Sequence, residues 1–433
     1  MRKCIYVIIL LINARLAFAQ MSGMTAMENS VGVLSSGTSI APRVVSEFVP
    51  MYHASISDWT LMLHGNAFLV DGQQTGPRGA DKFFSTNWIM PMVSRDFGRQ
   101  TLSFRTMFSL EPATVTQRRY PELFQSGETA YGLPIVDAQH PHDLFMELTG
   151  RYDFRLGDGG TRLYVYGGPI GEPALGPIAY PHRTPASENP LAVLGHHQQD
   201  STHVSDDVIT IGVSRGPVQL EASTFHGREP NENRWNIDAG KPDSFSSRLT
   251  MSMGNNLVGQ FSMGRINNRE ALEPNLDTLR TTASIEHDLR FSSGHVSSTL
   301  IWGRNKDLPG NGARIFNSYT AESTVNFKNR NWVWTRIENV DRDRTLLVGE
   351  KPAVLDVEED PIGRVQAYTF GYERDLPVRL SSINIGLGFQ ATTYGVPPQL
   401  QSVYGNHPAA FMAFIHIRPA GNMAAHMQMM HHH

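Results

Sequence analysis

The chain has 433 residues, a formal net charge of −4 and a slightly negative mean hydropathy. Its acidic balance argues against a nucleic-acid partner. The single cysteine, Cys4, lies next to the start of the chain, so we expect a mature protein without disulfides or cysteine-ligated zinc. After the first twenty residues, no stretch has the roughly 18 consecutive apolar residues of a membrane helix.

The first residues have the pattern of a secretory signal peptide. A basic start at Arg2 and Lys3 precedes an apolar run, and residues 17–19 read Ala-Phe-Ala, a small-residue cleavage pattern. We therefore predict a signal peptide over 1–19 and a mature chain that begins at Gln20. The signal peptide holds three basic and no acidic side chains, so the formal charge of the mature chain becomes −7.

From about residue 58 onward, apolar and polar side chains alternate. In 279–291, every second residue from Leu279 to Leu289 falls on one mainly apolar face, and residues such as Arg280 and Glu286 fall on the other. This period of two is typical of β-strands. The pattern predicts sixteen strands, near 58–70, 82–95, 100–110, 142–156, 161–170, 205–214, 217–227, 243–253, 256–266, 278–290, 294–305, 317–328, 331–341, 363–376, 380–394 and 407–418.

The connections between these strands alternate in length. Tight turns rich in Gly, Asn and Asp, such as 95–99 and 156–160, alternate with long polar loops, such as 111–141 and 171–204. Short turns at one end and long loops at the other are typical of bacterial outer-membrane barrels. We therefore predict an all-β fold, a transmembrane up-and-down antiparallel β-barrel of about 16 strands with periplasmic termini. A soluble β-helix or double sandwich is the alternative.

This interpretation divides the chain into four parts. They are the signal peptide over 1–19, a methionine-containing periplasmic segment over 20–56, an outer-membrane barrel over 57–420, and a Met/His-rich tail over 421–433. The expected location is the bacterial outer membrane, with membrane lipid around the barrel.

Histidines and carboxylates gather where two long loops run into strands. The histidines are His140, His142, His182, His196, His197 and His203, and the carboxylates are Asp137, Asp143, Glu188 and Asp200. Consecutive strands are neighbours in such a barrel, so we expect these residues to share one sector of the outer rim and residues 140–143 to contact 196–203. Imidazole and carboxylate groups suit Zn(II), Cu(II) or Ni(II). The alternatives are a hydrogen-bond network that packs the loops and a substrate-recognition surface.

A third long loop carries the sequence "FHGREPNENRW" (225–235), with Arg228, Glu229, Glu232 and Arg234. Opposed charges at a pore mouth would sort solutes by charge. A salt-bridge network within the loops is the alternative interpretation.

Soft metal ligands recur at both ends of the chain and on two strands. Met-rich flexible segments suit Cu(I), although composition alone also fits disordered tails, and the last three histidines fit the remnant of a purification tag. The terminal candidates are Met21, Met24, Met27, Met423, His426, Met427, Met429 and Met430. On the first and last strands, Met62, His64, Met412 and His416 are expected to face the lumen, as a group or as ordinary lumenal filler.

The stretches "VDAQHPHD" (136–143), "GGPIGEPALGPIAYPHRTPASENPLAVLGHHQQDSTHVSDDV" (167–208) and "FHGREPNENRW" (225–235) resemble a family of exported bacterial outer-membrane β-barrel proteins. Some members of this family are associated with copper or other metal handling. The resemblance covers about 57–300 and implies fold and location. It implies no reaction, so no catalytic residue follows from it.

The leading functional hypothesis is a porin-like channel with a role in copper or transition-metal binding or transport. Its partners would be small solutes or metal ions, and copper is the one cofactor considered. One alternative is an outer-membrane lipid hydrolase, since Asp200, Ser201 and His203 lie close together, but local adjacency is poor support for a triad and no G-x-S-x-G motif is present. The other alternative is a non-conducting barrel that binds a partner at its rim.

Overall fold

The computed structural model describes residues 31–157, 160–269, 275–308, 314–348, 352–355, 361–377 and 383–420. The predicted signal peptide lies outside this part of the chain. So do the terminal metal-ligand candidates Met21, Met24, Met27, Met423, His426, Met427, Met429 and Met430. No helix among the described residues is long and apolar enough to cross a membrane.

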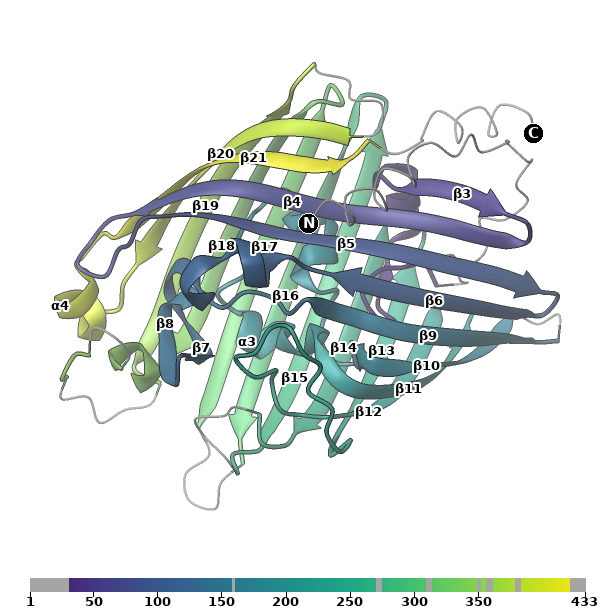
Figure 1. The fold of residues 1–433 in the computed structure, drawn as a ribbon, viewed down its shortest axis with the longest axis horizontal. Helices are drawn as coiled ribbons and strands as arrows, with labels where there is room; N and C mark the ends of the chain where they lie inside the picture. Colours follow the sequence, from purple (N-terminus) through teal and green to yellow (C-terminus); the bar gives the residue numbers. More distant parts are fainter. Residues whose placement is uncertain are drawn as a thin grey trace, which may run out of the picture.

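Sixteen antiparallel strands form one closed barrel, as predicted (Figure 1). Every predicted strand has its counterpart, and β21 pairs with β4 to close the ring. A short strand, β3 (Tyr52–Ile56), extends the sheet beside the start of β4. The barrel strands are β4 (Trp59–Gln74), β5 (Lys82–Phe97), β6 (Gln100–Phe108), β9 (Phe145–Leu156), β10 (Thr161–Gly171), β11 (Ser205–Arg215), β12 (Val218–Phe225), β13 (Ser244–Met253), β14 (Leu257–Ile266), β15 (Thr278–Phe291), β16 (Gly294–Asp307), β17 (Ile315–Phe327), β18 (Asn331–Arg342), β19 (Gly363–Asp375), β20 (Ile383–Gly395) and β21 (Ala409–Pro419).

The two faces of each strand differ in the way that the sequence predicts. On β15, Ile285 and Leu289 are exposed on the outer surface, whereas Arg280 and Glu286 are buried on the lumenal side. Exposed apolar side chains on other strands, such as Leu300, extend this outer band around the barrel. An outward apolar band and an inward polar face are the arrangement of a barrel that crosses a lipid bilayer.

The long loop between β6 and β9 contains structure that the alternation pattern did not predict. It forms a short helix, α2 (Glu111–Thr114), and a two-stranded sheet of β7 (Tyr120–Ala130) and β8 (Leu133–Gln139). This hairpin lies at the same end of the barrel as α4 (Gln401–Tyr404), the end of the long loops (Figure 1). Phe124 of β7 stacks on Tyr404, so the hairpin is attached to the loop between β20 and β21.

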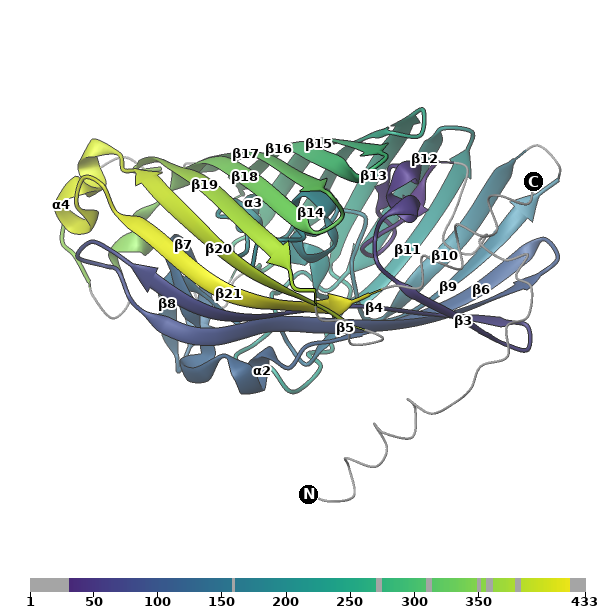
Figure 2. The same cartoon turned by 90° about the horizontal axis from the view of Figure 1, so that it is seen from above.

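The sequence predicts that the loop between β10 and β11 lies at the outer rim. In the structure it turns into the barrel instead. We call residues 172–204 the plug loop; its helix α3 (His196–Gln199) lies inside the ring of strands (Figure 1, Figure 2). The physical reason is a set of charged anchors on distant walls. Arg183 pairs with Glu322 of β17 at 2.7 Å, and Glu188 pairs with Arg418 of β21 at 2.7 Å.

Part of the segment that we assigned to the periplasm also lies inside the barrel. Residues 31–49, the N-terminal segment, enter from the end of the tight turns and include the strands β1 (Val33–Leu34) and β2 (Ile40–Ala41) (Figure 2). Lumenal arginines hold its backbone and hydroxyl groups: Arg105 donates to the carbonyl of Ser35 at 2.7 Å, and Arg248 donates to Ser39 Oγ at 2.7 Å.

The plug loop and the N-terminal segment meet near the middle of the lumen. The amide of Ala179 donates to Ser36 Oγ at 2.9 Å, and Ser39 Oγ donates to Glu172 at 3.0 Å. The lumenal side chain of Arg248 is 1% exposed, and those of Arg183 and Arg280 are fully buried. A 16-stranded barrel is wide enough for an aqueous path. At the level of these arginines, protein fills that space.

Candidate functional site

Two histidines from different loops face each other where the plug loop meets the start of β9. His142 precedes β9, and His203 ends the 3-10 turn η5 (Ser201–His203) of the plug loop. Their Nε2 atoms lie 3.3 Å apart. The predicted contact between residues 140–143 and 196–203 is therefore confirmed, although it lies within the folded loops and not on an open rim.

The outer nitrogen of each ring is already held by an oxygen acceptor. His142 Nδ1 lies 3.1 Å from both carboxylate oxygens of Glu111. Glu111 also accepts a hydrogen bond from the backbone amide of His142 at 2.8 Å. His203 Nδ1 lies 2.8 Å from the backbone carbonyl of Asp200. A carboxylate and a carbonyl accept but do not donate, so each Nδ1 carries a proton. In two neutral rings, both Nε2 lone pairs then point at one another, and a cation between them relieves this repulsion.

The spacing of the two nitrogens suits a metal ion. Tetrahedral Zn(II) holds imidazole nitrogens at about 2.0–2.1 Å, which places two such nitrogens about 3.3 Å apart. Fixing the far nitrogen of each ring through a carboxylate or a carbonyl is the usual support of a metal-bound histidine. Tyr180 adds a hydroxyl oxygen 3.1 Å from His142 Nε2. The pair thus offers two ligand nitrogens, each ring is held by a hydrogen bond at its other nitrogen, and the hydroxyl oxygen of Tyr180 lies nearby.

The two rings differ in their affinity for a proton. Burial alone lowers the pKa of His142, but the charge of Glu111 and its hydrogen bond overcome this effect and raise the pKa above its ordinary value. Burial, helped by the neighbouring rings of His196 and His142, lowers the pKa of His203 to about 3. Without a metal, His142 is the ring that holds the extra proton, and His203 accepts it.

His196 and His182 line the same part of the plug loop. His196 Nδ1 lies 2.8 Å from Asp200, whose other oxygen accepts from Arg183 at 3.1 Å. Burial opposes the charged form of Asp200, but His196 and then Arg183 keep its pKa below the ordinary range. Burial lowers the pKa of His182 well below its usual value, and nearby cationic groups add to this effect. Asp200 is therefore negatively charged, whereas the imidazoles of His196 and His182 are neutral.

The remaining rim histidines belong to a salt-bridge network that ties the loops together. His140 Nε2 lies 2.9 Å from Glu128 of β7, and Glu128 also pairs with Arg234. His197 Nδ1 lies 3.4 Å from Glu229. These contacts connect the β7–β8 hairpin, the plug loop and the loop of residues 226–243.

The charged residues of 228–234 pair with other loops and not with one another. Arg234 pairs with Asp143 at 3.3 Å, and Glu232 pairs with Arg118 at 3.1 Å, while Arg228 is exposed. Burial raises the pKa of Asp143 to about 6 in spite of Arg234. This arrangement corresponds to the salt-bridge alternative and gives no support to opposed charges across an open mouth. Asp137 is likewise structural, because it pairs with Arg78 and accepts from the Phe124 amide at 2.9 Å.

Among the described residues, one group of three acidic or imidazole side chains brings its ligand atoms within 4.8 Å of one another: Glu188, Glu373 and His416. The guanidinium of Arg418 already lies there, 2.7 Å from Glu188 and 2.8 Å from Glu373. An internal cation therefore takes the position that a metal would need, and we interpret this group as the anchor of the plug loop on β19 and β21.

The expected lumenal group of Met62, His64, Met412 and His416 is not one site. All four lie on lumenal strand faces, but Met412 pairs in register with Gly72, ten positions along β4 from Met62. The prediction compared the ends of the strands and ignored the stagger that closes a barrel. Met62 and His64 instead face Met92 and Met90 of β5.

Two residues that complete the His142–His203 site were not predicted. Glu111 lies thirty-one positions before His142 in a short helix with no metal-binding pattern, and Tyr180 lies in a Pro-rich stretch. The only sequence signal for Glu111 was its place at the start of the long loop that ends at His142.

Comparisons with known proteins agree with this architecture. No protein-family model and no curated protein matches the chain. Among solved structures, the chain is similar to an anion-selective porin from Comamonas acidovorans, with 11% identity, a TM-score of 0.52, and coverage of 83% of this chain and 99% of that one. The fold is that of an outer-membrane porin. OmpF of Salmonella typhi (8% identity, TM-score 0.48, 84% and 99% covered) and OprB of Pseudomonas putida (7%, 0.48, 83% and 94%) are also found.

Proposed function

We propose that this porin-like barrel resides in the bacterial outer membrane and binds a transition-metal ion at His142 and His203, inside a lumen that the plug loop keeps closed. The observation that carries the proposal is the pair of facing Nε2 atoms at 3.3 Å, each ring held from behind at Nδ1. The apolar outer band and the predicted signal peptide support the location.

The position of the site links metal binding to the plug. His203 belongs to the plug loop, whereas His142 is held by Glu111 beside the barrel wall. An ion between His142 and His203 connects the plug loop to the loop before β9, which Glu111 holds in place. Binding or release of metal therefore shifts the balance between the docked and undocked plug, because a ligand favours the state that offers both of its contacts. On this basis we propose a gated metal-handling channel.

The contacts of Ser201 favour a role without catalysis. Within the described part of the chain, Ser201 Oγ has no hydrogen-bond partner, and His203 Nε2 faces His142. Asp200 contacts His196 and Arg183 through its carboxylate. No serine–histidine hydrogen bond is therefore available for activating Ser201 as a nucleophile. We propose that these residues hold the plug and the metal.

Metal titration of the full chain, stripped with a chelator in detergent micelles, tests this function. The wild-type protein is expected to bind one Zn(II) or Cu(II) ion that the His142→Gln/His203→Gln variant does not bind. Glu111→Gln should lower the affinity about 10–100-fold, since it removes the carboxylate that orients a ligand. His226→Gln, in another long loop, is the matched control and should change nothing.

The terminal histidines and methionines are present in every variant, so their contribution is common to all titrations. Equal stoichiometry and affinity in the wild type and the double variant would contradict the proposal and leave His142 and His203 as packing residues.

A further inference from the structure

One stretch of the lumenal wall differs in chemistry from the rest. Many buried lumenal side chains are Arg, Glu, Ser or Thr, and other buried clusters mix aromatic and aliphatic residues, but one buried cluster on β4, β5, β6 and β9 consists of five methionines and one tryptophan. Its members are Met62, Trp88, Met90, Met92, Met107 and Met146. We call this cluster the methionine wall.

Cross-strand register brings the soft donors of the methionine wall into direct contact. Met62 lies directly opposite Met92, and His64 lies directly opposite Met90, on the same face of β4 and β5. Residues directly opposite in an antiparallel pair have Cβ atoms about 4.5–5.5 Å apart. The side chain of Met62 therefore lies beside that of Met92, and His64 lies beside Met90.

The plug loop supplies a second imidazole to this wall. His182 Nε2 lies 3.3 Å from Met107 Sδ, and its ring lies 4.7 Å from the ring of Trp88. The rings of His64 and His182 are 6.3 Å apart, with Trp88 in contact with both. His182 thus comes from the same loop as His203, and it lies two positions after Tyr180 in sequence.

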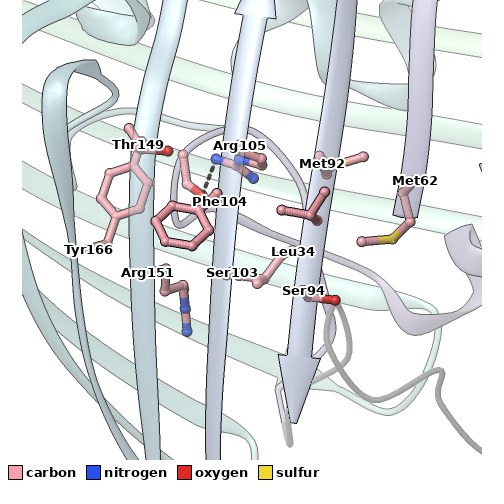
Figure 3. A pocket seen from close by; sticks show the side chains of 12 residues that line it. Leu34, Met62, Met92, Ser94, Ser103, Phe104, Arg105, Thr149, Arg151 and Tyr166 are labelled. Carbon is pink, nitrogen blue, oxygen red and sulfur yellow. Dashed lines mark hydrogen bonds between the residues drawn. The ribbon is translucent and has the colours of Figure 1, made fainter. Parts of the chain in front are cut away.

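A small pocket adjoins the wall on the side of the N-terminal segment (Figure 3). Met62 and Met92 line it together with Leu34 of β1. Two arginines are drawn in this view, Arg105 and Arg151. The charge of Arg105 is balanced by Glu147 at 2.7 Å. An ion held at the wall therefore has space beside it and meets little net repulsion.

Methionine is a common filler of irregular cores, which is the plain alternative. Three features go against it. The neighbouring buried cluster on β4 and β5 is filled by aromatic and aliphatic side chains such as Phe68, Val70 and Phe84, a histidine nitrogen points at a methionine sulfur, and no leucine or isoleucine belongs to the methionine wall. Thioether and imidazole ligands without a carboxylate favour Cu(I) and disfavour hard ions such as Mg²⁺.

We infer that the methionine wall, with His64 and His182, is a second metal site that takes a soft monovalent cation of the Cu(I) or Ag(I) class. This inference deepens the proposed function, on which it rests for the presence of metal in the lumen. The soft site, the methionine wall with His64 and His182, then lies between the His142–His203 pair and the pocket beside the N-terminal segment.

Titration of the full chain in detergent with Ag(I), a redox-inert probe of Cu(I) sites, tests the inference. Met90→Leu/Met107→Leu conserves side-chain volume, so the packing of the wall is retained. The stoichiometry of bound Ag(I) should fall by one ion in this variant, or its affinity should fall by at least about tenfold, as for other losses around a metal. Zn(II) binding at the histidine pair should not change.

The control is Met251→Leu/Met263→Leu on β13 and β14, whose methionines are 44% and 43% exposed on the lipid side. This control should bind Ag(I) as the wild type does. Wild-type Ag(I) stoichiometry and affinity in the Met90→Leu/Met107→Leu variant would overturn the inference.

A measurement on the unmodified protein covers the case in which the variant fails to assemble. NMR of isotope-labelled methionine methyl groups should show that Ag(I) shifts the resonances of lumenal methionines and leaves those of Met251 and Met263 in place. No shift of a lumenal methyl group would overturn the inference. Binding of Ag(I) at the wall by a protein that binds no Zn(II) at His142 and His203 would refute the proposed function and leave the soft site standing.

Discussion

Deletion of the plug loop is expected to turn a closed barrel into an open channel. Gly171 of β10 pairs directly with Ser205 of β11, so a short Gly/Ser linker can replace residues 173–203 without a change in the barrel. Single-channel conductance in planar bilayers should rise at least about tenfold over the intact protein, because barrels of 16 strands leave an aqueous channel when nothing fills them. Heat modifiability on gels should be retained.

A disulfide latch provides the matched control for this deletion. A Cβ placed on Gly195 would lie 3.0 Å from Ser318 Cβ on β17, slightly closer than the roughly 3.5–4.5 Å of a disulfide, so the bridge forms once the Gln199 side chain and the loop backbone shift by a few tenths of an ångström. In a Cys4→Ser background, Gly195→Cys/Ser318→Cys should crosslink and keep the conductance low until a reductant is added. Gly195→Cys/Tyr319→Cys should not crosslink, since Tyr319 points to the lipid. Equal conductance of the intact, latched and deleted forms would contradict the closed state.

Replacing Arg183 by methionine should release the plug loop from the wall. The buried guanidinium pairs with Glu322 at 2.7 Å and with Asp200 at 3.1 Å, and it donates to the carbonyl of Ile178 at 2.7 Å. Removing one partner of a buried charge network costs about 3–5 kcal/mol, since the carboxylates lose a counter-charge that water cannot replace. Hydrogen exchange of plug-loop amides should report a free energy of opening that is lower by this amount.

The exposed pair of Arg290 and Glu47 is the control for that substitution. Their atoms lie 2.9 Å apart, but each side chain is 37% exposed. Surface pairs contribute about 0–1 kcal/mol, so Arg290→Met should leave exchange in the plug loop nearly unchanged. Similar small effects of both substitutions would show that the plug does not depend on its charged anchors.

The barrel was predictable from sequence because each strand carries its own pattern. In β15, the alternation of Leu279, Arg280 and Thr281 fixes which face meets lipid, and no distant contact is needed. The β7–β8 hairpin has no such pattern. Phe124 adopts a positive φ angle of 68°, which breaks the regular strand at a bulky residue that indicates no turn.

The site was predictable in part. The contact between His142 and His203 follows from the neighbouring positions of β9, β10 and β11 in a sheet of consecutive strands. The path of the plug loop does not follow, because its anchors pair residues as distant as Arg183 and Glu322. The methionine wall could not be predicted either, because Met90 and Met107 come together only through the register of three strands and the position of His182.

The central claim is that His142 and His203 hold a metal ion inside a closed porin-like barrel. Anomalous scattering at the zinc absorption edge, measured on crystals of the full chain grown with Zn(II), tests it most directly. We predict a peak inside the barrel within about 2.0–2.2 Å of both Nε2 atoms. Anomalous peaks that lie only at surface or terminal histidines, with none between these two rings, would contradict the account.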